Sequence, residues 1–221
     1  MTVTSPVPGI KIRDLAVRFA DLTVFDALNF DIPARQFTAL LGPSGVGKTS
    51  ILRILAGLAR PSAGVVTATD AAPLAGRIAY MGQQDLLFPW ARVIDNVMLG
   101  ARLRGTPPDP ARAMDLLEKL GLANRARALP AELSGGMRQR VAIARTLYEQ
   151  RPIVLMDEPF SALDSLTRAR MQNRAAERRA GCTVLLITHD PQEACRLAHH
   201  LLVLSGHPAR LSAPIMVAGH P

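Results

Sequence analysis

The sequence predicts an α/β fold built on a mostly parallel β-sheet that helices cover on both faces. Short apolar runs rich in β-branched residues alternate along the chain with longer segments of helical spacing. A glycine-rich turn at residues 42–49 joins one of these apolar runs directly to a helical segment. The chain has 221 residues, 48% of them hydrophobic, which is enough to bury a sizeable core.

Strands dominate the first third of the chain. Apolar and polar residues alternate in its first two strands, a pattern typical of half-buried strands in a small antiparallel sheet. Pro33 and Ala34 mark a turn before a fully apolar strand, and a helix is expected over 49–58, after the glycine-rich turn. The strands expected here are 10–19, 28–32, 37–41, 65–69 and 78–81.

The middle of the chain predicts helices. After a loop expected over 83–90, helical spacing continues from residue 93 to about residue 150. Asp109 and Pro110 are typical of a helix start, and Gly121 is typical of a helix end. We therefore expect a helical subdomain inserted into a core that contains the sheets. The expected division is 85–149 for the helices, and 1–84 with 150–221 for the core.

Strands and helices alternate again in the last third of the chain. The apolar strand 153–156 leads to a helix that ends near Gly181. The strand 183–188 leads to a helix that begins at Asp190, and a last strand is expected over 201–204. The tail beyond it shows no clear pattern.

The net charge of +8 suits an anionic ligand or a negatively charged surface. Nucleic acid is not an expected partner, because the basic residues form no stripe with interleaved aromatics, which are only 4% of the chain. The densest basic stretch, 168–179, is interpreted as the solvated face of a helix. We expect no signal peptide in residues 1–10 and no membrane span, which places the chain in the cytoplasm.

Residues 42–49 match G-x-x-x-x-G-K-T, the pattern of a phosphate-binding loop, or P-loop. Its three glycines let successive backbone N–H groups curve around an anion, and the dipole of the following helix adds to the attraction. Lys48 can reach the β- and γ-phosphates of a nucleotide, and the Thr49 hydroxyl can bind Mg²⁺. A glycine-rich turn that matches by accident is the alternative. The nucleotide-binding residues expected here are Gly42, Pro43, Ser44, Gly45, Val46, Gly47, Lys48, Thr49 and Ser50.

Two acids, Asp157 and Glu158, follow the buried strand 153–156. A buried strand that ends in two acids can place them beside the P-loop. Asp157 would then hold Mg²⁺ through its water shell. Glu158 would orient or deprotonate the water that attacks the phosphate. A strand that simply ends in a polar turn is the alternative.

Residues 133–137 read Leu-Ser-Gly-Gly-Met and precede a helix. This segment resembles the LSGGQ signature of the ATP-binding cassette (ABC) ATPases, with Met137 in place of the usual glutamine. Arg138-Gln139-Arg140 follows it, as in many members of the family. The resemblance covers about residues 10–206 and implies the RecA-like core of a P-loop NTPase.

Further elements of the ABC family occur in the family's order, and the resemblance implies their roles. Gln83 resembles the glutamine of the Q-loop, residues 161–164 resemble the D-loop, and His189 resembles the switch histidine. Phe19 lies where the family stacks an aromatic ring on adenine, and an ordinary core position is the alternative. The implied catalytic residues are Lys48, Gln83, Glu158 and His189; the implied Mg²⁺ ligands are Thr49, Gln83 and Asp157; and the implied γ-phosphate contacts are Ser134, Gly135 and Gly136.

The resemblance also implies an assembly with ATP and Mg²⁺ as its cofactors. Two copies of the chain would pack head to tail, with each ATP between residues 42–49 of one copy and residues 134–136 of the other. Both halves of such a site contact the triphosphate, so closure of the dimer depends on ATP. Hydrolysis removes the contacts of the γ-phosphate, and the dimer opens.

Residues 88–90, Phe-Pro-Trp, lie soon after Gln83. This pair of proline and tryptophan resembles the importer branch for nitrate, aliphatic sulfonates, taurine and thiamine-pyrimidine precursors. The resemblance implies a separate membrane permease, an extracytoplasmic binding protein as an indirect partner, and a peripheral position on the inner face of the cell membrane. Residues 88–90 would lie near a groove that receives a short permease helix. As the alternative, Trp90 would anchor the core of the helical insert.

A soluble mechanical ABC ATPase that acts on nucleic acid or the ribosome is the second hypothesis. Chromosome-type members insert long coiled coils between the Q-loop and the signature, whereas the interval from Gln83 to Ser134 is short and has no sustained heptads. Translation-type members carry two cassettes in one chain, and this chain has one. A GTPase or a small-molecule kinase is disfavoured by the signature. We therefore prefer the transporter hypothesis.

Overall fold

The computed structural model describes residues 7–19, 22–164, 167–168 and 181–217 of the chain. The strands are β1 (Ile10–Phe19), β2 (Leu22–Ile32), β3 (Phe37–Leu41), β4 (Ala63–Ala68), β5 (Ile78–Met81), β6 (Ile153–Asp157), β7 (Thr183–Thr188), β8 (His200–Ser205), β9 (Arg210–Leu211) and β10 (Ile215–Met216). The helices are α1 (Lys48–Leu55), α2 (Val93–Val97), α3 (Leu99–Leu103), α4 (Pro110–Lys119), α5 (Gly135–Tyr148) and α7 (Pro191–Leu197). Short 3-10 turns occur at Ala123–Arg125 and Pro130–Glu132. The helix expected to end near Gly181 and most of the basic stretch 168–179 lie outside the described residues.

The central sheet is mostly parallel, as the sequence predicts. Its strands β8, β3, β7, β6 and β5 lie side by side in that order and run parallel, while β10 pairs antiparallel with β8 at one edge. Every residue of β6 and β7 is buried, as expected for parallel strands whose two faces are both covered. Because parallel strands end at the same edge of a sheet, the loops after β3, β6 and β7 meet there.

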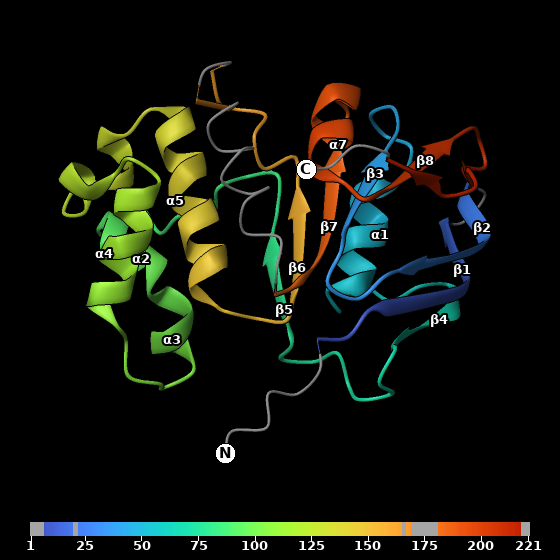
Figure 1. Ribbon diagram of the computed structural model, residues 1–221, viewed down its shortest axis with the longest axis horizontal. Helices are drawn as coiled ribbons and strands as arrows, with labels where there is room; N and C mark the ends of the chain where they lie inside the picture. Colours follow the sequence, from blue (N-terminus) through green and yellow to red (C-terminus); the bar gives the residue numbers. More distant parts are fainter. Residues whose placement is uncertain (1–6, 20–21, 165–166, 169–180, 218–221) are drawn as a thin grey trace.

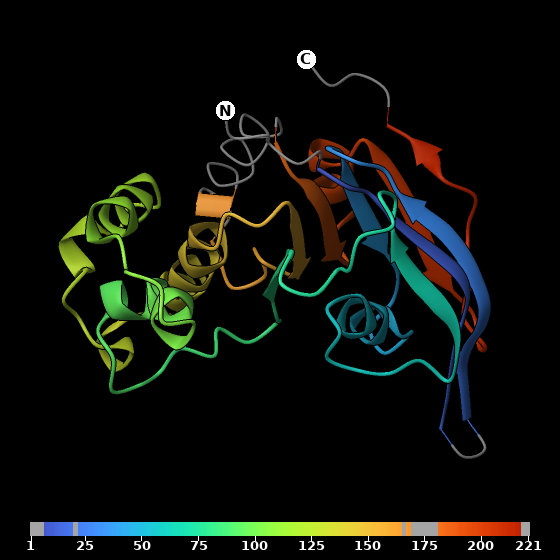
Figure 2. The same cartoon turned by 90° about the horizontal axis from the view of Figure 1, so that it is seen from below.

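Strands β2, β1 and β4 form the antiparallel sheet. The sequence predicts this sheet from residues before the P-loop, but β4, which comes after the P-loop, completes it by pairing with β1. Helix α1 lies between the antiparallel sheet and the central sheet (Figure 2). One hydrophobic core fills this space, and it includes Phe30 of β2, Ile51 of α1 and Leu155 of β6.

Helices α2, α4 and α5 gather on the other side of the central sheet, beside β5 and β6 (Figure 1). A second hydrophobic core joins them to that sheet and includes Leu117 of α4, Val141 of α5 and Met156 of β6. Strand β6 contributes to both cores because successive residues of a strand face opposite sides. The Asp109 carboxylate accepts a hydrogen bond of 3.0 Å from the Arg112 N–H, which confirms the predicted helix start. The division at 85–149 stays a prediction.

The tail contains β9 and β10, which the sequence does not reveal because strands of two residues are too short for a periodic pattern.

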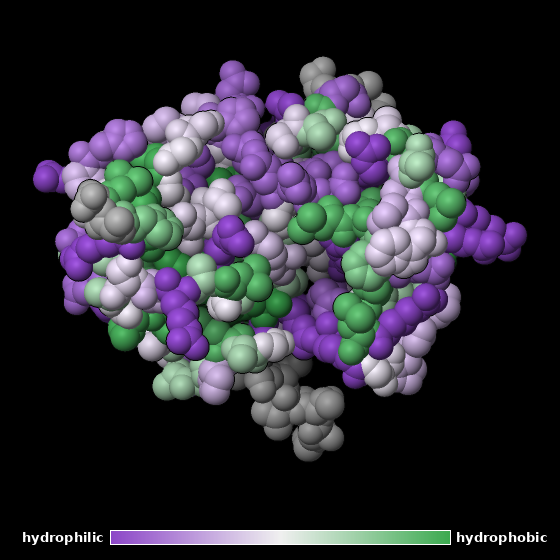
Figure 3. Space-filling view, turned by 180° about the vertical axis from the view of Figure 1, so that it is seen from behind, coloured by the Kyte–Doolittle hydropathy of each residue, from purple (hydrophilic) through white to green (hydrophobic). Residues whose placement is uncertain are grey.

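The face of the molecule opposite to Figure 1 carries apolar side chains in patches that hydrophilic residues separate (Figure 3). Within the described residues, the helices are all too short or too polar to span a bilayer.

Candidate nucleotide-binding site

The P-loop connects β3 to α1, as the sequence predicts, and its last glycine occupies a position that no other residue would fit. Gly47 precedes α1 with a φ of 110°. A Cβ atom at Gly47 would lie 2.8 Å from Val24 Cγ1 and 3.2 Å from the Phe25 ring. Both neighbours belong to β2, so the antiparallel sheet packs directly on the P-loop. The glycine therefore allows the turn to pass close to β2 before the helix begins.

Lys48, the first residue of α1, folds back into the P-loop. Its Nζ donates hydrogen bonds of 2.8 Å to the carbonyl oxygens of Gly42 and Pro43. The side chain is only 6% exposed. Burial lowers the pKa of Lys48 below its ordinary value, and the charges of Glu158 and Asp157 oppose that shift. The ammonium group thus lies on the inside of the loop with two acids close by, where an anion would gain from its charge.

Thr49 and Asp157 meet across the edge of the central sheet. The Thr49 hydroxyl donates a hydrogen bond of 2.7 Å to Asp157 Oδ2. Burial raises the pKa of the Asp157 carboxyl and the charge of Glu158 adds to the rise, whereas the Thr49 hydrogen bond and the charge of Lys48 oppose it. A hydroxyl and a carboxylate are oxygen ligands of the kind that Mg²⁺ prefers, so these two residues fit the predicted ion.

Glu158 and His189 meet at the ends of β6 and β7. His189 Nδ1 lies 2.9 Å from Glu158 Oε1. Glu158 has a φ of 47°, which is uncommon for a residue with a side chain. Its N–H donates to the Ile187 carbonyl at 2.9 Å, and its own carbonyl accepts from the Ser161 hydroxyl at 3.0 Å. These bonds hold the peptide in a strained conformation that aims the carboxylate at His189.

The signature segment, Ser134 to Gly136, begins α5 as predicted. The Ser134 hydroxyl caps the helix by accepting a 3.3 Å hydrogen bond from the Met137 N–H. Met137, which differs from the usual signature residue, is partly buried against the core of the helical part. A Cβ atom at Gly136 would lie 3.0 Å from the Ala162 carbonyl, so the D-loop passes close to it. Within one chain, α5 and α1 lie on opposite sides of β5 and β6 (Figure 1).

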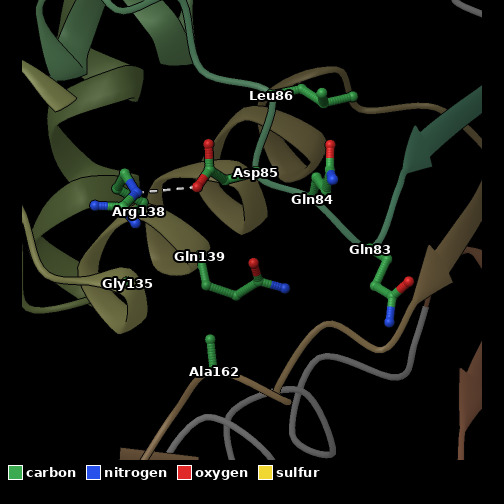
Figure 4. Close-up of a pocket in the computed structure, with 8 residues that line it drawn as sticks. All are labelled: Gln83, Gln84, Asp85, Leu86, Gly135, Arg138, Gln139 and Ala162. Carbon is green, nitrogen blue, oxygen red and sulfur yellow. Dashed lines mark hydrogen bonds and ion pairs between the residues drawn. The ribbon is translucent and has the colours of Figure 1, made fainter. Parts of the chain in front are cut away.

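A cavity of about 410 Å³ lies between the loop after β5, the start of α5 and the D-loop. Gln83 lies on one side of it at the end of β5, while Asp85 and Arg138 point toward each other across another side (Figure 4). The Gln83 side chain is exposed and makes no hydrogen bond with another described residue. The residues that line the cavity are Gln83, Gln84, Asp85, Leu86, Gly135, Arg138, Gln139 and Ala162.

Phe19 and Trp90 are both too exposed for the core position that was the alternative role of each. Phe19 is 63% exposed at the end of β1, so the alternative that it is an ordinary core residue is wrong. Trp90 is 74% exposed, so the alternative that it anchors the core of the helical insert is wrong as well. The Trp90 ring packs against Phe88 with ring centroids 5.0 Å apart. Phe19 and Trp90 are therefore available for contacts outside the chain.

Sequence reasoning missed the residues that hold the loop after β5. Buried Asn96 accepts a 2.8 Å hydrogen bond from the Phe88 N–H and donates one of 2.9 Å to the Ala91 carbonyl. Arg145 donates to the carbonyls of Asp85 and Leu86. The seven-residue spacing of Arg138 and Arg145 is the one available signal, because it puts two arginines on the same face of α5.

Replacing Asp157 with asparagine is expected to stabilise the nucleotide-free protein by about 1 kcal/mol at neutral pH. Burial raises the pKa of Asp157 in the folded state, so the folded chain keeps this proton to a higher pH than the unfolded chain does. The free energy of unfolding therefore falls as pH rises from the unfolded-state pKa of Asp157 to its folded-state pKa. The full loss of stability is present at neutral pH. The asparagine still accepts the Thr49 hydrogen bond. Urea unfolding at neutral pH and at acidic pH checks the expectation, and an equal gain at both would contradict it.

Comparisons with known proteins agree with this geometry. A family model described as "ABC transporter" matches residues 25–161. An "Uncharacterized ABC transporter ATP-binding protein" of Haemophilus influenzae is 41% identical over 96% of this chain and 89% of its own length. "Aliphatic sulfonates import ATP-binding protein SsuB 1" of Rhodococcus jostii is 43% identical over 89% of this chain and 79% of its own length.

Solved structures give the same result. The dimeric structure of MJ0796, a bacterial ABC transporter cassette, superposes with a TM-score of 0.85 at 27% identity and covers 96% of this chain and 100% of its own. A dimeric post-hydrolysis state of MJ0796 bound to ADP and Pi superposes with a TM-score of 0.84 at 28% identity, with the same coverage.

Proposed function

Because the chain belongs to the ABC transporter family and is an ATPase of its importer branch, we propose that it powers a separate membrane permease with ATP. It would work on the cytoplasmic side, peripheral to the membrane. The observation that carries this proposal is the surface of the loop after β5. Leu86 is 61% exposed and Trp90 is 74% exposed in that loop. Apolar side chains held outward in this way suit a short permease helix.

The residues at the end of the central sheet have complementary roles in hydrolysis. Lys48 and the N–H groups of the P-loop bind the β- and γ-phosphates. Thr49 and Asp157, with Gln83, would hold Mg²⁺, which neutralises phosphate charge when it is bound. Glu158 accepts a proton from the attacking water. His189 contacts Glu158 through Nδ1, so Nε2 is the ring atom that would meet the γ-phosphate.

A second copy of the chain completes the site. In one chain the signature segment begins α5, on the other side of β5 and β6 from the P-loop (Figure 1). A partner packed head to tail would bring its Ser134, Gly135 and Gly136 to the γ-phosphate. The N–H groups at the start of its α5 would then donate to the anion. Phe19, exposed at the end of β1, is the residue we propose for stacking on adenine.

Aliphatic sulfonates are the substrate class that we propose first, because several relatives are named for sulfonate import. Nitrate, taurine and thiamine-pyrimidine precursors come next. The permease and an extracytoplasmic binding protein would select the solute, since the P-loop and the signature segment contact only ATP. Uptake of a labelled sulfonate by cells with and without the chain tests this choice. Equal uptake in both would contradict sulfonate import.

The permease is tested by recovering the tagged chain from detergent-solubilised membranes of its own host. We expect a membrane protein with several spans to co-purify, and Trp90→Ser to lower its recovery about tenfold. Leu103→Ser is the matched control, because Leu103 is also 74% exposed but lies on α3, outside the loop. Recovery of only ribosomes or DNA-bound proteins would instead support the soluble mechanical ATPase.

A further inference from the structure

Helix α5 is joined to the loop after β5 by two arginines. Arg138 Nε lies 3.1 Å from Asp85 Oδ2, an ion pair that Figure 4 shows. Two turns further along the same face, Arg145 donates from Nη2 to the Asp85 carbonyl at 2.6 Å and from Nη1 to the Leu86 carbonyl at 2.9 Å. The two contacts of Arg145 span 59 and 60 residues of sequence, so they link two separate parts of the fold.

The two carbonyls that Arg145 binds flank a strained position. Leu86 has a φ of 46°, in the left-handed region that leucine seldom adopts. This conformation turns the Leu86 side chain outward, where it is 61% exposed. A planar guanidinium can bind both carbonyls at once, whereas the ammonium of a lysine lacks the forked geometry that reaches both. Arg145 thus supplies the bonds that offset the strain.

The later residues of the loop are also hydrogen-bonded to a helix, whereas the side chains of residues 83 and 84 form no such bond within the described residues. Buried Asn96 of α2 binds the backbone of residues 88–92 through its amide. In contrast, the side chains of Gln83 and Gln84 are exposed and make no hydrogen bond within the described residues. Gly82 just before them has no side chain to pack. The contacts that tie the loop to the helices therefore begin at Asp85.

We propose that Arg145 is a positioning residue that holds Asp85 and Leu86 on α5, so that loop 85–92 moves together with the signature segment. The joint between the loop and the central sheet then lies at residues 82–84, and it contains Gln83. When Arg145 holds the far side of this joint, the backbone that follows Gln83 is fixed to α5. Transmission to a permease rests on the proposed function, whereas the link itself can be tested on the isolated protein.

Arg145→Lys tests the link, with Arg112→Lys as the matched control. Arg112 of α4 likewise donates to two successive carbonyl oxygens, those of Leu147 and Tyr148 at the end of α5, and not to the loop. Trp90 is the only tryptophan of the chain, so fluorescence anisotropy reports the mobility of this loop directly. We expect Arg145→Lys to lower the Trp90 anisotropy and kcat for ATP hydrolysis, the latter about tenfold, while KM for ATP stays within about twofold.

A second substitution separates positioning from loss of folding. Asparagine tolerates positive φ far better than leucine does, so Leu86→Asn removes most of the strain that Arg145 offsets. We expect the double variant Arg145→Lys with Leu86→Asn to regain at least about half of the lost kcat and anisotropy. No recovery in the double variant would overturn the proposal, and so would an equal loss in Arg112→Lys. Since the assay contains only this chain and ATP, failure of the permease proposal would not affect it.

Discussion

Replacing Glu158 with glutamine is expected to leave ATP binding intact and to slow hydrolysis about a thousandfold. Glutamine keeps the size of the side chain and its contact with His189, but it cannot accept a proton from water. The backbone bonds that hold Glu158 come from Ile187 and Ser161, so the substitution leaves the local fold unchanged. Because the γ-phosphate stays in place, the ATP-bound dimer should accumulate.

Steady-state hydrolysis, ATP binding and size-exclusion chromatography with ATP check this expectation together. Glu149→Gln is the control, because Glu149 pairs with Arg104 at the end of α5 and takes no part in the site. If Glu158→Gln hydrolyses ATP at the wild-type rate, Glu158 is not the base. Normal binding without dimer accumulation would instead contradict the part of the account that links opening to hydrolysis.

Replacing Lys48 with methionine is expected to weaken ATP binding about a hundredfold while leaving the fold at least as stable. The ammonium is the buried positive charge of the P-loop, and burial lowers its pKa because the charged form loses solvation. Methionine fills a similar volume without that cost. The wild type should therefore gain thermal stability from ATP, whereas the variant should need about a hundredfold more ATP for the same gain.

Thermal unfolding with increasing ATP measures both effects in one experiment. Lys119→Met is the control, because Lys119 is an exposed lysine paired with Asp115 on α4. An ATP-dependent rise in the melting temperature of Lys48→Met that matches the wild type would contradict the assignment. A variant that melts far below the wild type without ATP would show that the bonds to Gly42 and Pro43 are structurally required.

The parts of the site that could be predicted are those written in short stretches of sequence. The P-loop, the acids at the end of β6 and the cap at Ser134 each depend on a few neighbouring residues, and the structure has the end of β6 and the starts of α1 and α5 at these patterns. Parallel strands that end at one edge then bring Thr49 to Asp157 and Glu158 to His189.

The contacts that could not be predicted join distant segments through a side chain and a backbone group. No local pattern shows that Arg145 binds the carbonyl of Leu86, because the two residues lie 59 positions apart and neither is marked by its neighbours. Strand β4 joins the antiparallel sheet for a similar reason: its pairing with β1 depends on tertiary packing, which a pattern over 65–69 does not contain. The exposure of Trp90 could not be predicted either, since an aromatic residue suits a core or a contact surface equally well.

Mixing two defective variants tests most directly whether each ATP lies between the P-loop of one copy and the signature segment of the other. Lys48→Met disables the P-loop. Gly135→Asp places a negative charge at the start of α5, where it repels phosphate yet suits the helix dipole. The nearest atom to a Cβ there is Arg138 Nη2 at 3.9 Å, so the side chain fits.

Each variant alone should be inactive, because both sites of its dimer carry one defect. A mixed dimer has both defects in one site and none in the other, so an equal mixture should recover about a quarter of the wild-type rate. A mixture that stays as inactive as the separate variants would show that the P-loop and the signature segment act within one chain, and would contradict the account.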